Sequence, residues 1–129
     1  MNNEKAQALI DSARSAAQEL GTPMSIAVVD GGGYLVAFER MDGCSFLSCD
    51  IATGKAWTAA AVGVTTAMFN QIAGEDTAFL VGGSAALQGR LMAVPGGAPV
   101  RDGETVIGAI GISGGTAEQD QQIADAAVA

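Results

Sequence analysis

Three charged side chains lie close together in the sequence and could bind or transform an anion. Arg40 and Asp42 end a predicted strand, and Lys55 lies on the helix predicted after it. The N–H donors of Arg40 suit a carboxylate ligand, although Arg40 could instead pair with Asp42 at the surface, which contributes less than about 1 kcal/mol. Lys55 either reaches solvent along its apolar stem or is partly desolvated. The second state lowers the pKa of the amine and suits anion binding or imine chemistry.

Two glycine-rich segments offer backbone N–H groups as a second kind of anion site. Gly96 and Gly97 lie in a loop that Pro95 and Pro99 stiffen, and Ser113-Gly114-Gly115 precedes the last predicted helix. Free N–H groups before a helix can receive an anion. For Ser113-Gly114-Gly115 the alternative is that the glycines turn the chain and permit close packing. For the loop at 95–99 the alternative is a tight connection between two strands. Neither segment matches a nucleotide-binding fingerprint.

The chain contains no histidine, which excludes several classes of site. Ser-His-Asp and Cys-His catalysis, the HExxH zinc helix and histidine-ligated haem cannot be built from it. Cys44 and Cys49 do not form a CxxC pair, so we expect free thiols and no metal site, with a reactive thiol as the alternative. Scattered methionines could ligate a soft metal or haem iron, but they more often fill gaps in a core.

The net charge of −8, from 6 Lys and Arg against 14 Asp and Glu, narrows the range of partners. Nucleic acids and anionic membranes require clustered basic residues, so we expect neither as a partner. No apolar run approaches the length of a membrane span, and the polar N-terminus has no signal-peptide pattern. These features predict a cytoplasmic protein.

The hydrophobic spacing predicts one α+β domain over residues 1–129. The expected elements are a helix at 3–20, a hairpin of strands at 24–30 and 34–40, helices at 51–63 and 65–74, strands at 91–94, 100–103 and 105–113, and a helix at 116–128. Residues 75–89 are expected to be loop with a helical turn. Strands joined mostly by hairpins indicate a largely antiparallel sheet, and the apolar run 105–113 indicates its central strand.

Four segments carry a family resemblance: SIAVVDGGGYLVAFERMDG, IATGKAWTAA, PGGAPV and VIGAIGISGGTAEQDQQIA. In this order they resemble the GlcG/HbpS-like proteins, also called the haem-degrading domain family, which includes the C-terminal domain of PduO-type proteins. The resemblance extends over residues 3–128. It implies a profilin-like α-β-α fold, with a five-stranded antiparallel sheet flanked by helices, and assembly of the chain with itself into dimers or octamers.

The resemblance also implies where a site would lie. The recurrent polar positions of the family fall on Arg40, Asp42, Lys55, Thr58, Gly96, Gly97, Ser113, Gly114 and Asp120. Some family members bind haem, so haem is a possible ligand although no cofactor is required. Because this chain lacks histidine, iron ligation would fall to Met, Lys, Tyr or a thiolate, or haem would be held by packing alone.

Three hypotheses about function follow. In the first, an accessory protein of a catabolic pathway binds or transforms a small carboxylated or aldehydic metabolite, with Arg40 and Lys55 holding the anion. If it is an enzyme, Asp42 or Lys55 would move a proton in a hydrolysis, hydration or tautomerisation. The second is a haem-buffering or haem-sensing protein, and the third a non-catalytic scaffold. A cavity shared by Lys55 and Arg40 would favour the first, and Met41 or Met68 facing a porphyrin-sized slot would favour the second.

Overall fold

The computed structural model describes all residues from 1 to 129. In chain order the elements are α1 (Asn3–Leu20), β1 (Ser25–Asp30), β2 (Leu35–Arg40), α2 (Leu47–Val62), α3 (Thr66–Ala73), α4 (Thr77–Ala86), β3 (Gly97–Asp102), β4 (Thr105–Ser113) and α5 (Ala117–Val128). The predicted α+β class is confirmed. Thr116 and Gln119 form the reciprocal capping box that the sequence pattern predicts at the start of α5.

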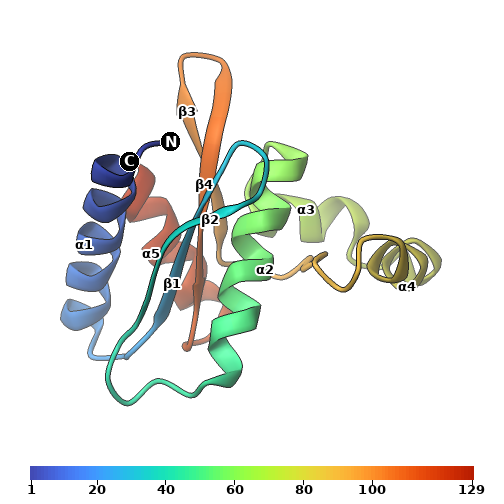
Figure 1. Ribbon diagram of the computed structural model, residues 1–129. Coiled ribbons are helices and arrows are strands. Elements are labelled where there is room, and N and C mark those ends of the chain that lie inside the picture. The colour runs from blue at the N-terminus through green and yellow to red at the C-terminus, as the bar shows by residue number, and fades with distance from the viewer.

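The sheet has four antiparallel strands in the order β2-β1-β4-β3 (Figure 1). The apolar strand β4 lies between β1 and β3, as its composition predicts. The prediction of five strands is wrong, because residues 91–94 form no strand. Side chains of two helices hold this segment instead: the Met92 N–H donates to Thr58 Oγ1 at 2.8 Å, and Asn70 Nδ2 donates to the Ala93 carbonyl at 2.9 Å.

Helices cover both faces of the sheet. Helices α1 and α5 lie side by side on one face, and α2 lies on the other (Figure 1). The core on the α1 and α5 side contains large aliphatic side chains, among them Ile10, Ile26, Ile110, Ile112 and Ile123. The core under α2 is formed by alanines and one valine: Ala27, Val29, Ala52, Ala56, Ala59 and Ala109. Small side chains on both surfaces let α2 approach the sheet closely.

Gly111 on β4 marks the closest approach of α2. A Cβ atom at this position would overlap the carbonyl oxygen of Ala52 and lie 2.5 Å from the backbone nitrogen of Ala56. No side chain larger than hydrogen fits there. This contact limits how closely the part of α2 around Ala52 and Ala56 can approach β4.

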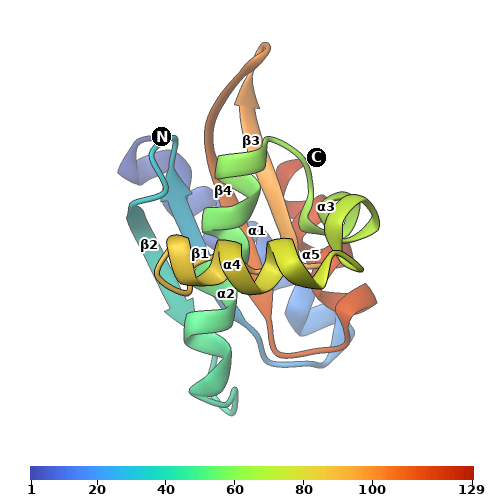
Figure 2. The same ribbon diagram turned by 90° about the vertical axis from the view of Figure 1, so that its right-hand side faces the viewer.

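Residues 77–86, expected to be loop with a helical turn, form the ten-residue helix α4. Helix α4 lies outside α2, on the side away from the sheet (Figure 2), and none of its residues is buried. Asp76 caps it by accepting from the Phe79 N–H at 3.0 Å. The Phe79 ring packs edge-on against Phe69 of α3, with the ring centroids 6.2 Å apart. The chain then returns to the sheet through residues 87–96.

Candidate functional site

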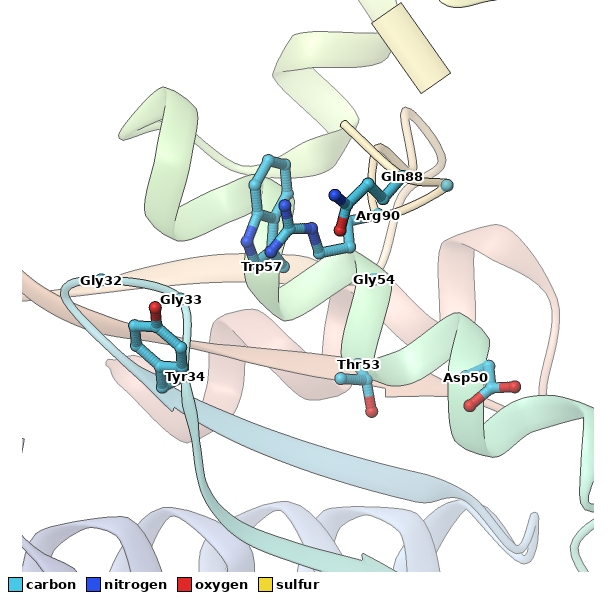
Figure 3. A pocket seen from close by; sticks show the side chains of 10 residues that line it. Gly32, Gly33, Tyr34, Asp50, Thr53, Gly54, Trp57, Gln88 and Arg90 are labelled. Carbon is cyan, nitrogen blue, oxygen red and sulfur yellow. The ribbon is translucent and has the colours of Figure 1, made fainter. Parts of the chain in front are cut away.

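A cleft of about 420 Å³ lies between α2, the β1–β2 turn and the segment that follows α4 (Figure 3). Its volume lies in the range of small-molecule sites in proteins. We call it the Trp57 cleft, and its lining residues are Gly32, Gly33, Tyr34, Asp50, Thr53, Gly54, Trp57, Gln88, Gly89 and Arg90.

One face of α2 supplies the floor of this cleft. Asp50, Thr53, Gly54 and Trp57 are spaced at i, i+3, i+4 and i+7, which places them along one side of a helix. Gly33 of the turn packs against the indole, since a Cβ atom there would lie 2.6 Å from Trp57 Cδ1. Gly33 also has a φ of 85°, a conformation that L residues rarely adopt. The turn sequence Gly31-Gly32-Gly33 therefore allows the wall of the cleft to close on Trp57.

Arg90 is the cation of the Trp57 cleft. Its guanidinium carbon lies 5.1 Å from the centroid of the Trp57 ring, a cation–π contact. Its Nε donates to the Leu87 carbonyl at 3.0 Å, which anchors the side chain. No carboxylate forms an ion pair with Arg90. The two terminal amino groups of the guanidinium are therefore available to an anion.

Neither Trp57 nor Arg90 was identified from the sequence. Two signals could have indicated them: Trp57 is the single tryptophan of the chain, and Arg90 is one of six cations. What brings them together is the path of residues 87–96 across α2, which follows from the unpredicted helix α4.

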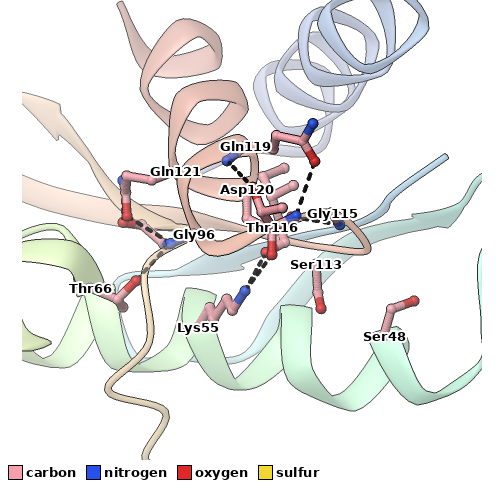
Figure 4. A network of polar contacts seen from close by, with 12 residues as sticks. Ser48, Lys55, Thr66, Gly96, Ser113, Gly115, Thr116, Gln119, Asp120 and Gln121 are labelled. Carbon is pink, nitrogen blue, oxygen red and sulfur yellow. Dashed lines mark hydrogen bonds and ion pairs between the residues drawn. The ribbon is translucent and has the colours of Figure 1, made fainter. Parts of the chain in front are cut away.

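Lys55, predicted as a catalytic or anion-binding amine, lies in the interior with 2% of its surface exposed. Its Nζ donates to Asp120 Oδ2 at 2.8 Å and to the Ile112 carbonyl at 3.0 Å (Figure 4). Asp120 is also buried, and its second carboxylate oxygen accepts from the Gly115 N–H at 2.9 Å. The pair connects α2, β4 and the start of α5, and Lys55 lines none of the clefts.

Gly96 and Gly97 lie beside Lys55, and their N–H groups have partners within the protein. The Gly96 N–H donates to Gln121 Oε1 at 2.7 Å, and the Gly97 N–H donates to Thr66 Oγ1 at 2.7 Å. A Cβ atom on Gly96 would lie 2.8 Å from Lys55 Nζ. The glycines thus permit close packing over the buried amine.

The other predicted site residues on this side of the molecule are buried or closely packed. Thr58 is fully buried, and its hydroxyl accepts from the Met92 N–H. Ser113 ends β4 and is 8% exposed. Gly114 has a φ of 143°, and a Cβ atom there would lie 2.7 Å from the Pro23 carbonyl oxygen. The N–H of the next residue, Gly115, points to Asp120 and is not free for an anion.

Arg40 and Asp42 lie in a separate cleft of about 340 Å³, which we call the Arg40 cleft. It is lined by Arg14, Gln18, Glu39, Arg40, Met41 and Asp42. Arg40 and Asp42 form no ion pair with each other. The structure therefore groups Lys55 with Gly96 and Gly97 but places Arg40 and Asp42 elsewhere, so Lys55 and Arg40 share no cavity.

Arg14 supplies the ion pairs of the Arg40 cleft. It donates to both carboxylate oxygens of Glu39, at 2.7 and 2.9 Å, and to Asp11 at 2.9 Å. The hydrogen bonds that Arg14 donates to Glu39, and then the one to Asp11, raise the pKa of Arg14. Hydrogen bonds from Gln7 and then Arg14 lower the pKa of Asp11. Arg14 therefore forms ion pairs within the protein, whereas Arg40 forms none.

Three further observations concern the cysteines, metal binding and the helices. Cys44 and Cys49 are free thiols, with Cys44 Sγ 3.1 Å from Ser48 Oγ. No group of three or more Cys, Asp and Glu side chains is arranged to hold a metal ion. None of the helices combines the length and the apolar character that crossing a membrane demands.

Comparison with known proteins identifies the family. The family model described as "Haem degrading protein HbpS-like" matches residues 1–129. This chain belongs to the HbpS-like family. The resemblance in the four sequence segments is thereby confirmed.

Relatives of this HbpS-like chain include three with informative names. Protein GlcG of Escherichia coli K12 is 38% identical over 114 residues, which cover 88% of this chain and 81% of GlcG. Corrinoid adenosyltransferase PduO of Salmonella typhimurium is 37% identical over 122 residues, which cover 94% of this chain but only 36% of PduO. A crystal structure of a PduOC:haem complex superimposes with a TM-score of 0.89 at 32% identity, covering 99% of this chain and 92% of that one.

Proposed function

We propose that this HbpS-like protein binds a small carboxylate-bearing metabolite in the Trp57 cleft, as an accessory protein of a catabolic pathway. The observation that carries the proposal is Arg90, which is held over Trp57 and paired with no carboxylate of the protein. An arginine guanidinium presents planar N–H donors that match a carboxylate. The indole beside it offers an apolar surface for the body of the ligand.

The Trp57 cleft is better suited to binding than to catalysis. Its titratable side chains are Tyr34, Asp50 and Arg90, and all three are exposed to solvent. General acids and bases are usually tuned by burial and charged neighbours. The cleft also contains no lysine, so capture of an aldehyde as an imine has no residue to perform it there.

Haem is the second candidate, favoured by the PduOC:haem complex of a relative. The Trp57 cleft could accept a planar ring against the indole and a propionate at Arg90. Its lining residues offer only oxygen ligands for iron, from Tyr34 and Asp50, and no sulfur. Met41 lines the polar Arg40 cleft, and Met68 lines no cleft. The lining of the Trp57 cleft therefore offers haem an aromatic surface and a cation but few ligands for iron.

Self-association is part of the proposal and is supported by the surface of α4. Residues 77–89 carry no charged side chain, and Val81 and Ile72 are 67% and 71% exposed. Two copies with a net charge of −8 each avoid close contacts between like charges where they meet through an uncharged surface. We therefore place the contact with a second copy on α4 and the exposed side of α3.

A fluorescence titration tests the ligand proposal, because Trp57 is the single tryptophan and lies in the cleft. The probe is 4-methylbenzoate, and the matched control is 4-methylbenzyl alcohol, which lacks the carboxylate. We expect a saturable change with the acid only. Haemin is titrated in parallel with the Soret band as readout. A saturable, shifted Soret band without any response to the acid would replace the carboxylate proposal with the haem candidate.

A further inference from the structure

The two ends of the Trp57 cleft carry opposite charges. Arg90 lies at the Trp57 end, and Asp50 lies at the other end of the same α2 face (Figure 3). Asp50 is exposed and, like Arg90, forms no ion pair within the protein. Asp50 and Trp57 are seven residues apart on α2, which corresponds to about 10 Å along the helix axis.

Side chains at the two ends also differ in hydrogen-bonding capacity, with donors at the Trp57 end and acceptors at the Asp50 end. At the Trp57 end, the guanidinium of Arg90 and the indole N–H can only donate. At the Asp50 end, the ionised carboxylate can only accept. The Thr53 hydroxyl donates its proton to the Cys49 carbonyl at 2.9 Å, so its oxygen is left with acceptor capacity toward a ligand.

We infer that the ligand of this cleft is a zwitterion. Its carboxylate would lie against Arg90 and Trp57, and its ammonium group against Asp50 and Thr53. An apolar, extended or flat body would join the two groups along the α2 face, beside Gly54. This inference rests on the proposed function, since it names the chemical class of ligand for the same cleft.

The separation of the two ends sets the length of the ligand. The rise of about 10 Å along the helix axis suits a ligand whose two charged groups are joined by a few carbon–carbon bonds or by one aromatic ring. An α-amino acid, whose charged groups sit on one carbon, is too short to reach both ends.

The test compares two probes that differ only in the ammonium group, 4-(aminomethyl)benzoate and 4-methylbenzoate, by the fluorescence of Trp57. We expect the zwitterion to bind about fivefold more tightly, as for a solvent-exposed ion pair of good geometry. In Asp50→Asn this advantage of the zwitterion over 4-methylbenzoate should disappear. Asp42→Asn makes the same change in the Arg40 cleft and should leave the advantage intact.

The outcomes separate this inference from the proposed function. Equal affinities for the two probes, or an advantage that survives in Asp50→Asn, would overturn the inference of a zwitterionic ligand. Carboxylate binding in the Trp57 cleft would remain in place. If neither probe binds, the proposed function fails together with this inference.

Discussion

Lys55 Nζ and Asp120 Oδ2 lie 2.8 Å apart, and both side chains are almost completely buried. Each charge also has a backbone partner, the Ile112 carbonyl for Lys55 and the Gly115 N–H for Asp120. A buried pair of this kind is costly to break because the remaining charge has no compensating partner. The lysine that the sequence suggests as a reactive amine therefore forms a buried ion pair that joins three elements.

Lys55→Met should destabilise the protein by about 3–5 kcal/mol, because it leaves Asp120 buried without its cation. Asp120→Leu should act in the same direction, because it leaves Lys55 buried without its anion. The double variant Lys55→Met/Asp120→Leu should lose much less than the sum of the single losses, since it removes both charges. Urea unfolding of the four proteins gives the comparison. Additive losses would show that the two residues do not act as a pair.

Gly111→Ala should destabilise the protein by about 3 kcal/mol, because its methyl group has no space beneath α2. Gly82→Ala on α4 is the matched control, since a Cβ atom there would have no neighbour within 4 Å. The control should be neutral or stabilising by up to about 1 kcal/mol, because alanine favours helix. A tolerated Gly111→Ala would contradict the close approach of α2.

The lowered pKa of Asp11 predicts a small dependence of stability on pH. A carboxyl group with a depressed folded-state pKa contributes stability above its unfolded value of about 4, and the contribution is lost as pH falls through the folded value. Gln7 is the first cause of the shift and Arg14 the second. Gln7→Ala should raise the pKa of Asp11 in an NMR titration, whereas Gln18→Ala on the same helix should not. An unchanged pKa in Gln7→Ala would rule out that hydrogen bond as the cause.

Val81→Glu tests the proposed self-association. The substitution adds a charge to the uncharged surface of α4 without touching a buried residue. Two copies facing each other there would bring like charges together, so the assembly should dissociate. Sedimentation velocity of the wild type and the variant measures the mass, and Glu118→Gln on α5 is the control. If the wild type self-associates and Val81→Glu sediments identically, the contact between copies does not lie on this surface of α4.

Local patterns predicted most of the fold. The β1–β2 hairpin, the central strand β4 and the capping box at Thr116 depend on neighbouring residues, and all three are confirmed. The segment 91–94 has the composition of a strand, but side chains of Thr58 and Asn70 hold it against helices. Helix α4 escaped prediction because its sequence, TAFLVGGSAA, has two glycines and no amphipathic pattern.

The candidate site depends on contacts between distant parts of the chain. Asp120 lies 65 residues from Lys55 in the sequence, so no local pattern could show that the lysine pairs with a carboxylate. Arg90 reaches Trp57 only because α4 returns the chain across α2. Residue types alone drew attention to Arg40 and Lys55, since cations are scarce, but they could not show which cation lies unpaired in a cleft with an aromatic surface.

The most direct test of the central claim is the affinity for 4-methylbenzoate in the wild type, Arg90→Gln and Arg40→Gln, measured by the fluorescence of Trp57. Hydrogen bonds to a charged group contribute about 1.5 kcal/mol or more, which corresponds to a factor of about ten in affinity. We expect Arg90→Gln to weaken binding about tenfold and Arg40→Gln to leave it unchanged. Unchanged binding in Arg90→Gln, or a loss confined to Arg40→Gln, would contradict the assignment of the ligand to the Trp57 cleft.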